Sequence, residues 1–307
     1  MTTTLDSLFP GQDPVLLDGA MGTALFSRGW EPERPTALAN LQAAQDVLAI
    51  HREHRGAGAQ ILTTNTFAAL SVDEGQRDGA VRAAVELARE AANAPVTPSP
   101  CTTPAGATPL QVRADSTGAA LPTTAQDPAL VAGCLTLYGI DDDDPRLAQT
   151  VELLVAQGVD LLVFESCHTV HAASTALRLK ATVAAHLPMV ICASSTDGSA
   201  PDQQRVADIL TAIRDDDSPG VEAGLNCCRG PEDTLVLSLS TRPPVRWVKP
   251  STGLPAQPAD SQAMAAFARA ARLRGARFLG ACCGSDPAIL SAMAHALLPT
   301  SQQKSSP

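Results

Sequence analysis

Short apolar runs alternate with amphipathic helical patterns along almost the whole chain, and this alternation limits the possible folds more than any other feature. The runs predict strands because they are short and bounded by turn residues. They lie in the segments PVLLDG, AQILTTNTF, LVAGCLTL, VDLLVFES, LPMVICAS, VEAGLNC, VRWVKP and ARFLGACC. These eight strand-then-helix units match a single (β/α)8 TIM-type barrel, although a doubly wound open sheet also alternates strands with helices.

Helices are predicted between the runs by apolar residues at the i, i+3, i+4, i+7 spacing, which forms one stripe along a helix. Two such stripes are Val206, Ile209, Leu210, Ile213 and Met264, Phe267, Ala268, Ala271. Helices are also expected over residues 41–56 and 79–93. Asp286 before Pro287 is typical of a helix N-cap and first turn, so the last unit also ends in a helix.

The less common polar residues and thiols fall at or just past the C-terminal ends of these runs. They are Asp18, Thr64, Glu165, Asn226, Cys227, Cys282 and Cys283. In a barrel these strand ends converge on one mouth, whereas an open sheet spreads them along an edge. The positions therefore favour the barrel and predict a single site at its mouth.

One stretch interrupts the alternation. Residues 94–127 are rich in Pro and Thr and show little apolar periodicity, so we expect an irregular loop between the second helix and the third strand. A loop after a helix lies on the face opposite the mouth, so we expect no part for it in the chemistry. We predict one barrel domain over residues 1–299, this loop included, and a flexible tail over 300–307.

Charge and cysteine content narrow the function classes. The formal net charge of -10 argues against nucleic acid or an anionic membrane as partner. The first residues lack the basic start and apolar run of a signal peptide, and no apolar stretch is long enough to span a bilayer, so we expect a cytoplasmic protein. In a reducing compartment, the eight cysteines indicate metal binding or thiol chemistry rather than a disulfide framework.

The adjacent pair Cys282 and Cys283 follows the last run, and a second adjacent pair, Cys227 and Cys228, ends the sixth. A catalytic zinc site uses three protein ligands and leaves a fourth position open, which the later pair and one cysteine of the earlier pair could supply. Neighbouring residues on a strand point to opposite faces, so both later thiols reach one metal only if the chain turns, as Gly284 permits.

Other interpretations of the cysteines stay open. Adjacent cysteines also occur as small buried apolar residues, and we assign Cys101, Cys134 and Cys192 to loop or core. A rival ligand set is offered by Cys167, His168 and His171, although this stretch more simply reads as the start of a helix.

Five segments, in order along nearly the whole chain, resemble the homocysteine S-methyltransferase family, and are most similar to the homocysteine-binding barrel of cobalamin-dependent methionine synthase. They are LLDGAMGTAL at 16–25, GAQILTTNTF at 58–67, GLNCCRGP at 224–231, PSTGLP at 250–255 and GACCGSDP at 280–287. The resemblance implies a (β/α)8 barrel that transfers a methyl group to homocysteine and forms methionine.

The resemblance also implies the site residues. Zn²⁺ would be held by Cys227, Cys282 and Cys283, with Cys228 not a ligand, and the open position would take the homocysteine thiol. The substrate-binding positions of the family fall on Asp18, Gly19, Thr64, Asn65 and Glu165. The two carboxylates suit the substrate ammonium, backbone N–H groups of residues 19–22 suit its carboxylate, and Asn226 is expected to orient a ligand.

Such a site has a chemical reason. The thiolate is the reactive form of a thiol, and coordination to Zn²⁺ deprotonates the thiol near neutral pH. Three thiolate ligands carry more negative charge than the metal carries positive charge, so the substrate sulfur stays nucleophilic while it is bound.

The methyl donor is less determined. The sequence has no D-x-H-x-x-G cobalamin motif and no residues for a folate barrel, so we expect methylcobalamin on a separate protein, or S-methylmethionine, S-adenosylmethionine or betaine. Cationic donors bind aromatic faces, for which Trp30, Phe67, Tyr138, Phe164 and Trp247 are candidates. The alternatives are methylation of another small thiol, a zinc hydrolase, and a noncatalytic barrel with a redox thiol cluster or a structural zinc that uses Cys228.

Overall fold

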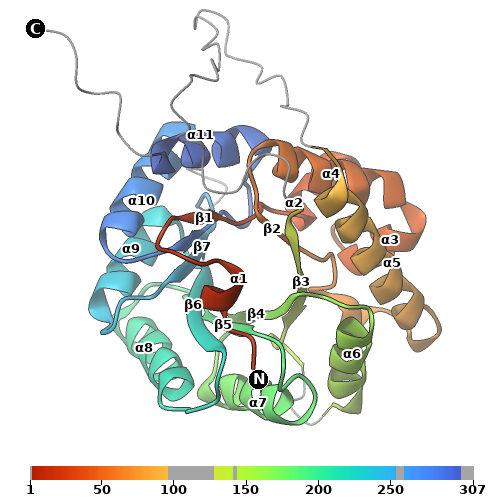
Figure 1. The fold of residues 1–307 in the computed structure, drawn as a ribbon, viewed down its shortest axis with the longest axis horizontal. Helices are drawn as coiled ribbons and strands as arrows, with labels where there is room; N and C mark the ends of the chain where they lie inside the picture. Colours follow the sequence, from red (N-terminus) through yellow and green to blue (C-terminus); the bar gives the residue numbers. More distant parts are fainter. Residues whose placement is uncertain (1, 96–127, 141–143, 254–258, 299–307) are drawn as a thin grey trace, which may run out of the picture.

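A computed structural model describes residues 2–95, 128–140, 144–253 and 259–298, and in it helices surround a ring of strands (Figure 1). Nearly all of the predicted loop at 94–127 and the whole predicted tail at 300–307 lie outside the described residues. The limits of the predicted domain therefore stay a prediction.

The strands form one parallel sheet of eight, in the order β1-β8-β7-β6-β5-β4-β3-β2. Leu17 bridges to Ile61 in parallel and so joins the first strand to the second. The (β/α)8 barrel predicted from the alternation is confirmed, and the open doubly wound sheet is excluded. The strands are β1 (Val15–Leu16), β2 (Ile61–Thr63), β3 (Leu130–Thr136), β4 (Leu161–Cys167), β5 (Met189–Ala193), β6 (Val221–Cys227), β7 (Trp247–Pro250) and β8 (Phe278–Leu279).

The helices pack around the strands. They are α1 (Leu5–Leu8), α2 (Gly22–Ser27), α3 (Ala39–Gln42), α4 (Ala44–Gly56), α5 (Glu74–Asn93), α6 (Pro145–Ala156), α7 (Val170–Thr182), α8 (Ala200–Arg214), α9 (Pro231–Ser240), α10 (Ser261–Leu273) and α11 (Pro287–Leu297), with 3-10 turns η1 (Thr36–Leu38) and η2 (Ala69–Ser71). Both predicted apolar stripes are buried, on α8 and α10. Among the helices described, none combines the length and apolar character needed to cross a membrane.

Local sequence explains where several helices begin. The Asp286 side chain accepts a hydrogen bond from the backbone N–H of Ile289, and Pro287 occupies the first turn, as predicted. The helix predicted over 79–93 instead begins at Glu74. The prediction missed the first turn because that turn is polar and carries no apolar stripe. The helix predicted over 41–56 is divided at Ala43, where the backbone leaves the helical region between α3 and α4.

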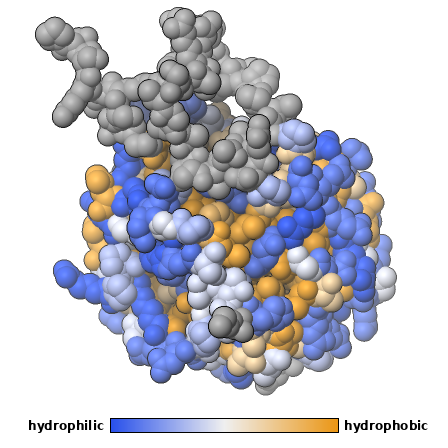
Figure 2. Space-filling view, viewed as in Figure 1, coloured by the Kyte–Doolittle hydropathy of each residue, from blue (hydrophilic) through white to orange (hydrophobic). Residues whose placement is uncertain are grey.

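The barrel interior is apolar and is closed at one end by the N-terminal segment. Leu5 and Phe9 pack on strand residues that include Trp247 and Phe278, whose rings stack at 5.6 Å. Figure 1 shows α1 lying across the centre of the ring of strands. On this face, hydrophobic side chains show between many hydrophilic ones (Figure 2). The end with α1 is therefore filled, which leaves the opposite end for a site.

Candidate active site

The C-terminal ends of the strands enclose a cavity of about 430 Å³. Residues from distant parts of the chain line it, and they include eight of the nine predicted site residues: Gly19, Thr64, Asn65, Glu165, Asn226, Cys227, Cys282 and Cys283. The ninth, Asp18, is 2% exposed and lies in the wall behind the lining residues. The predicted convergence at one mouth is therefore present in the fold.

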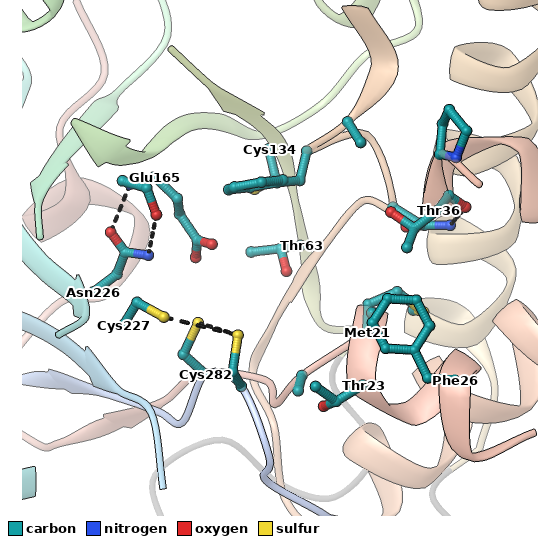
Figure 3. A pocket seen from close by; sticks show the side chains of 18 of the residues that line it. Met21, Thr23, Phe26, Thr36, Thr63, Cys134, Glu165, Asn226, Cys227 and Cys282 are labelled. Carbon is teal, nitrogen blue, oxygen red and sulfur yellow. Dashed lines mark hydrogen bonds between the residues drawn. The ribbon is translucent and has the colours of Figure 1, made fainter. Parts of the chain in front are cut away.

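Three of these residues bring their sulfur atoms together. Cys227 Sγ lies 3.7 Å from Cys283 Sγ, and Cys282 Sγ lies 3.9 Å from Cys283 Sγ. Figure 3 shows the Cys227 and Cys282 sulfurs turned into the same space. Zn–S bonds of about 2.3 Å at tetrahedral angles separate two sulfurs by about 3.8 Å, so the observed spacing fits a shared metal ion.

The backbone turns that aim these sulfurs are unusual. Cys227 and Cys228 have φ of 58° and 51°, in the left-handed region that residues other than glycine rarely adopt. After β8, Gly284 has φ of +80°, and a Cβ there would come 2.4 Å from Thr252 Oγ1. The turn predicted at Gly284 is therefore present, and it lets both thiols of the adjacent pair reach one point.

The remaining described cysteines do not join this group. Cys228 is buried, and its thiol donates to the Asn226 carbonyl oxygen at 3.4 Å. Cys134 and Cys192 are buried, as predicted. Cys167 is buried, His168 packs against Tyr138 with the two rings tilted at 60°, and His171 is exposed, so the rival set does not converge. Within the described residues, three sulfurs are the one group placed to hold a metal ion.

The three thiols shift one another's pKa values. Hydrogen bonds donated by Cys227 and Cys282 lower the pKa of Cys283 well below that of an ordinary thiol. Hydrogen bonds of the Cys227 thiol with Cys282 and Cys283, together with burial, raise the pKa of Cys227. Cys283 is therefore the thiol that ionises most readily, and a metal ion that bound all three sulfurs would have to displace the protons of Cys227 and Cys282.

The two predicted carboxylates share a buried lysine. Lys249 Nζ lies 2.8 Å from Asp18 Oδ1 and 3.2 Å from Glu165 Oε1. Asp18 Oδ2 accepts two further hydrogen bonds of 2.7 Å, from the backbone N–H and the hydroxyl of Thr63. Asp18 is thus engaged on both oxygens, whereas Glu165 lines the cavity.

The surroundings shift the pKa values of these two carboxylates in opposite directions. Burial raises the pKa of Glu165 to about 7, against the opposing effect of Lys249. Burial also opposes ionisation of Asp18, but Lys249 and Thr63 outweigh it, so its pKa is lowered. Burial disfavours the charged lysine, yet the two carboxylates raise the pKa of Lys249 well above its ordinary value. Asp18 and Lys249 are therefore a charged pair, and Glu165 changes charge near neutral pH.

Hydrogen bonds join the strand ends around the cavity. Asn226 Oδ1 accepts from the backbone N–H of Ser166 at 2.8 Å, which ties β6 to the end of β4 (Figure 3). Ser166 itself has φ of 59°. The Thr64 hydroxyl accepts from the Cys134 backbone N–H, and the Asn65 side chain donates to the Thr36 carbonyl oxygen. These predicted residues also hold the mouth in shape.

An apolar wall faces the sulfurs across the cavity. Met21 and Phe26 lie on the opposite side from Glu165, Asn226 and Cys227 (Figure 3). Of the aromatic residues proposed for donor binding, Phe67 also lines the cavity. Phe164 and Trp247 belong to the core, Trp30 stacks under Arg34, and Tyr138 lies outside the cavity lining.

Sequence reasoning missed Lys249, Thr63 and Phe26. Lys249 could have been found from the sequence, because a lysine buried in a strand such as VRWVKP destabilises the fold unless it has a charged partner. Thr63 precedes a predicted strand end by one residue, and Phe26 lies in the short helix α2, which no periodicity indicated.

Comparison with known proteins adds an independent finding. The model of a family described as homocysteine S-methyltransferase matches residues 15–297. Among solved structures, two that are similar to the chain are of homocysteine methyltransferase MmuM from Escherichia coli. The metallated form has 24% identity and a TM-score of 0.69, with 95% of this chain and 99% of that chain covered. The oxidized form has 24% identity and a TM-score of 0.70, with 96% and 99% covered. Curated protein sequences give no match.

Proposed function

Because the chain belongs to the homocysteine S-methyltransferase family and is a methyltransferase, we propose that it uses zinc to transfer a methyl group to the thiol of homocysteine, forming methionine. The observation that carries this proposal is the group of three sulfurs from Cys227, Cys282 and Cys283 at the mouth. They surround one point and leave the cavity side of it open to a fourth ligand.

The donor set favours zinc. Three thiolates suit a soft or borderline metal, and their spacing matches tetrahedral Zn–S geometry. The similar MmuM structure is of a metallated form, which is consistent with a metal in this kind of fold. When bound, zinc would lower the pKa of the substrate thiol and keep the thiolate directed into the cavity.

The protein's own residues would bind the rest of homocysteine. Glu165 lines the cavity near the sulfurs and suits the substrate ammonium, while Asp18 acts from behind it through Lys249. Gly19, Thr64 and Asn65 line the same cavity, and Asn226 holds the strand end before Cys227. In the transfer, the substrate sulfur forms a bond to the methyl carbon. The bond between that carbon and the donor atom breaks, with its electron pair returning to the donor.

The donor is proposed to enter over the apolar wall. Met21, Phe26 and Phe67 offer a thioether and two aromatic rings, which suit a methyl group on a sulfonium or quaternary ammonium centre. S-methylmethionine, S-adenosylmethionine and betaine are donors of this kind, and methylcobalamin on a separate protein is the alternative.

The free cysteines of the described residues agree with a location in the cytoplasm, which we also propose.

A noncatalytic barrel with a closed metal site is less well supported. Its fourth ligand would be Cys228, whose thiol is buried and donates to a backbone oxygen instead of approaching the other three sulfurs. Methylation of a different small thiol would use the same three sulfurs. It would differ only in the contacts to the part of the substrate that lies away from the thiol. A comparison of thiol substrates separates it from homocysteine methylation.

The test is a methyl-transfer assay with zinc-loaded protein, homocysteine and each donor in turn, including free methylcobalamin. Cys283→Ala should lose both bound zinc and methionine formation, whereas Cys192→Ala, which removes a buried thiol away from the cluster, should keep both. The proposal fails if wild type and Cys283→Ala protein give the same rate with every donor. It also fails if purified protein binds no zinc.

A further inference from the structure

Lys249 is a buried cation at the bottom of the cavity. It lies on β7, pairs in register with Asn226 of β6, and is 3% exposed. Lys249 nevertheless is one of the residues that line the cavity. Removing an ammonium group from water costs several kcal/mol, so a lysine is kept in such a place only with compensating partners.

The charges around Lys249 do not balance within the chain. Its ammonium meets two carboxylates, and Asp18 already has Thr63 as a second partner, so the group of three side chains carries one surplus negative charge when both acids are ionised. That surplus belongs to Glu165, which faces the cavity together with Lys249. An anion and a cation 3.2 Å apart therefore line the same wall.

An α-amino acid carries an ammonium group and a carboxylate, which can pair with the Glu165 carboxylate and the Lys249 ammonium, respectively. At the buried wall of the cavity its carboxylate requires a cation or N–H donors. Of the described residues, Arg34 and Lys249 are the cationic side chains that line the cavity. The Arg34 guanidinium stacks on Trp30 at 4.2 Å and bonds to Gln42, so it is already engaged by residues that do not line the cavity. Of the N–H groups of residues 19–22 expected to take this carboxylate, that of Ala20 already donates to Ser285 Oγ. Lys249 is the cation beside the carboxylate that suits the ammonium.

From this geometry we infer that Lys249 is a specificity-determining residue whose ammonium binds the carboxylate of the thiol substrate while Glu165 binds the substrate ammonium. The inference rests on the proposed function, and it names the part of the substrate that this lysine recognises. A thiol without the carboxylate would leave Lys249 with its two intramolecular partners and gain nothing from it. Lys249 thus selects an amino-acid thiol over an aminothiol.

The test measures binding of two thiols to the zinc-loaded full chain by calorimetry: homocysteine and 3-mercaptopropylamine, which lacks the carboxylate. Wild type should bind homocysteine at least about tenfold more tightly, since a hydrogen bond to a charged group contributes that much. In Lys249→Met the ratio should fall to about one, through weaker homocysteine binding. In Lys249→Arg, which keeps the charge, part of the preference should return.

A matched control exists elsewhere in the barrel. Lys180 is also buried, but it donates to the carbonyl oxygens of Ala184, Ala185 and Leu187 and lines no part of the cavity. Lys180→Met therefore removes a buried ammonium without touching the site, and it should keep the wild-type ratio of the two thiols.

The outcomes separate the two proposals. Equal binding of both thiols by wild type overturns the inference, even if Lys249→Met does not fold. A preference for homocysteine that Lys249→Met retains also overturns it. In both cases, formation of methionine by wild type would leave the proposed function standing. Wild-type protein that binds neither thiol overturns both.

Discussion

The two ends of the barrel both contain buried charges, but they treat them differently. At the end closed by α1, Arg277 is 3% exposed and is bonded to Asp6 and to the Phe9 and Asp13 carbonyl oxygens. At the mouth, Glu165 shares the single lysine with Asp18, and the three sulfurs of Cys227, Cys282 and Cys283 face one another. Partners within the chain therefore satisfy the buried charge at one end, whereas at the other end the buried groups line a cavity.

Backbone conformation also differs between the mouth and the end closed by α1. Among the described residues, the non-glycine residues with positive φ are Ser166, Cys227 and Cys228, and all three lie at the mouth. Such conformations each cost about 1–3 kcal/mol, so surrounding contacts must hold them. The comparison teaches that this barrel gathers its strained backbone and its shared charges at one end, which is the end of the proposed site. The following changes test that division, from the largest expected effect to the smallest.

Removal of one sulfur should separate metal binding from folding. A structural zinc site contributes about 10–16 kcal/mol over four ligands, or about 3 kcal/mol for each ligand. Cys227→Ala should therefore weaken zinc binding by at least about a hundredfold, measured by competition with a chelator. The midpoint of urea unfolding of the metal-free protein should change little. If zinc affinity is unchanged, the mouth is not the metal site.

Stability should depend on pH through Glu165. Its folded pKa of about 7 lies above the ordinary value of 4.5, so the folded state binds the proton more tightly. The stabilisation is therefore complete below pH 4.5 and is lost as the pH rises through 7, by about 3 kcal/mol in total.

Urea unfolding of metal-free wild type and Glu165→Gln between pH 5 and 8 measures this contribution, since the other titrating groups cancel in the difference. The stability of wild type relative to the variant should fall as the pH rises. Parallel pH profiles would show that Glu165 titrates as an ordinary exposed carboxyl.

At the closed end, a change should affect stability alone. Arg277→Met removes the donor to the buried Phe9 carbonyl oxygen and to the partly buried Asp13 carbonyl oxygen, and should lower the free energy of unfolding by about 2–3 kcal/mol. Arg274→Met, at an exposed position one turn away in sequence, should cost less than about 0.5 kcal/mol. Zinc affinity should be the same in both. A loss of zinc binding in Arg277→Met would show that the two ends are coupled.

The smallest effect is expected at Asn226, which touches no sulfur of the cluster but holds the strained end of β4. Outer partners of a metal site typically contribute ten- to a hundredfold, and Asn226→Ala should weaken zinc binding by about tenfold. Ser166→Ala keeps the backbone N–H that Asn226 accepts from and should have little effect. Equal losses in both variants would instead assign the contribution to the Ser166 side chain.

Much of this site could be predicted from the strand ends, and some of it could not. The convergence of Glu165, Asn226 and Cys227 follows from the barrel, because parallel strands bring their C-terminal ends to one mouth. Asp18 was expected to face the substrate, and its role toward the ammonium stays a prediction. Its place behind Lys249 depends on which side chains fill the barrel centre, and strand spacing does not report that. The closest branch of the family also stays a prediction.

The sequence by itself determined the repeated strand and helix units, the position of the turn at Gly284 and the membership of three cysteines in one site. Each depends on local periodicity, on a residue that tolerates positive φ, or on a motif that is continuous in the chain. Only the tertiary structure decided that Lys249 stands between Asp18 and Glu165, and that Asp18 lies behind the residues that line the cavity. These outcomes depend on closure of the sheet, which sets distances between side chains on strands that are far apart in sequence.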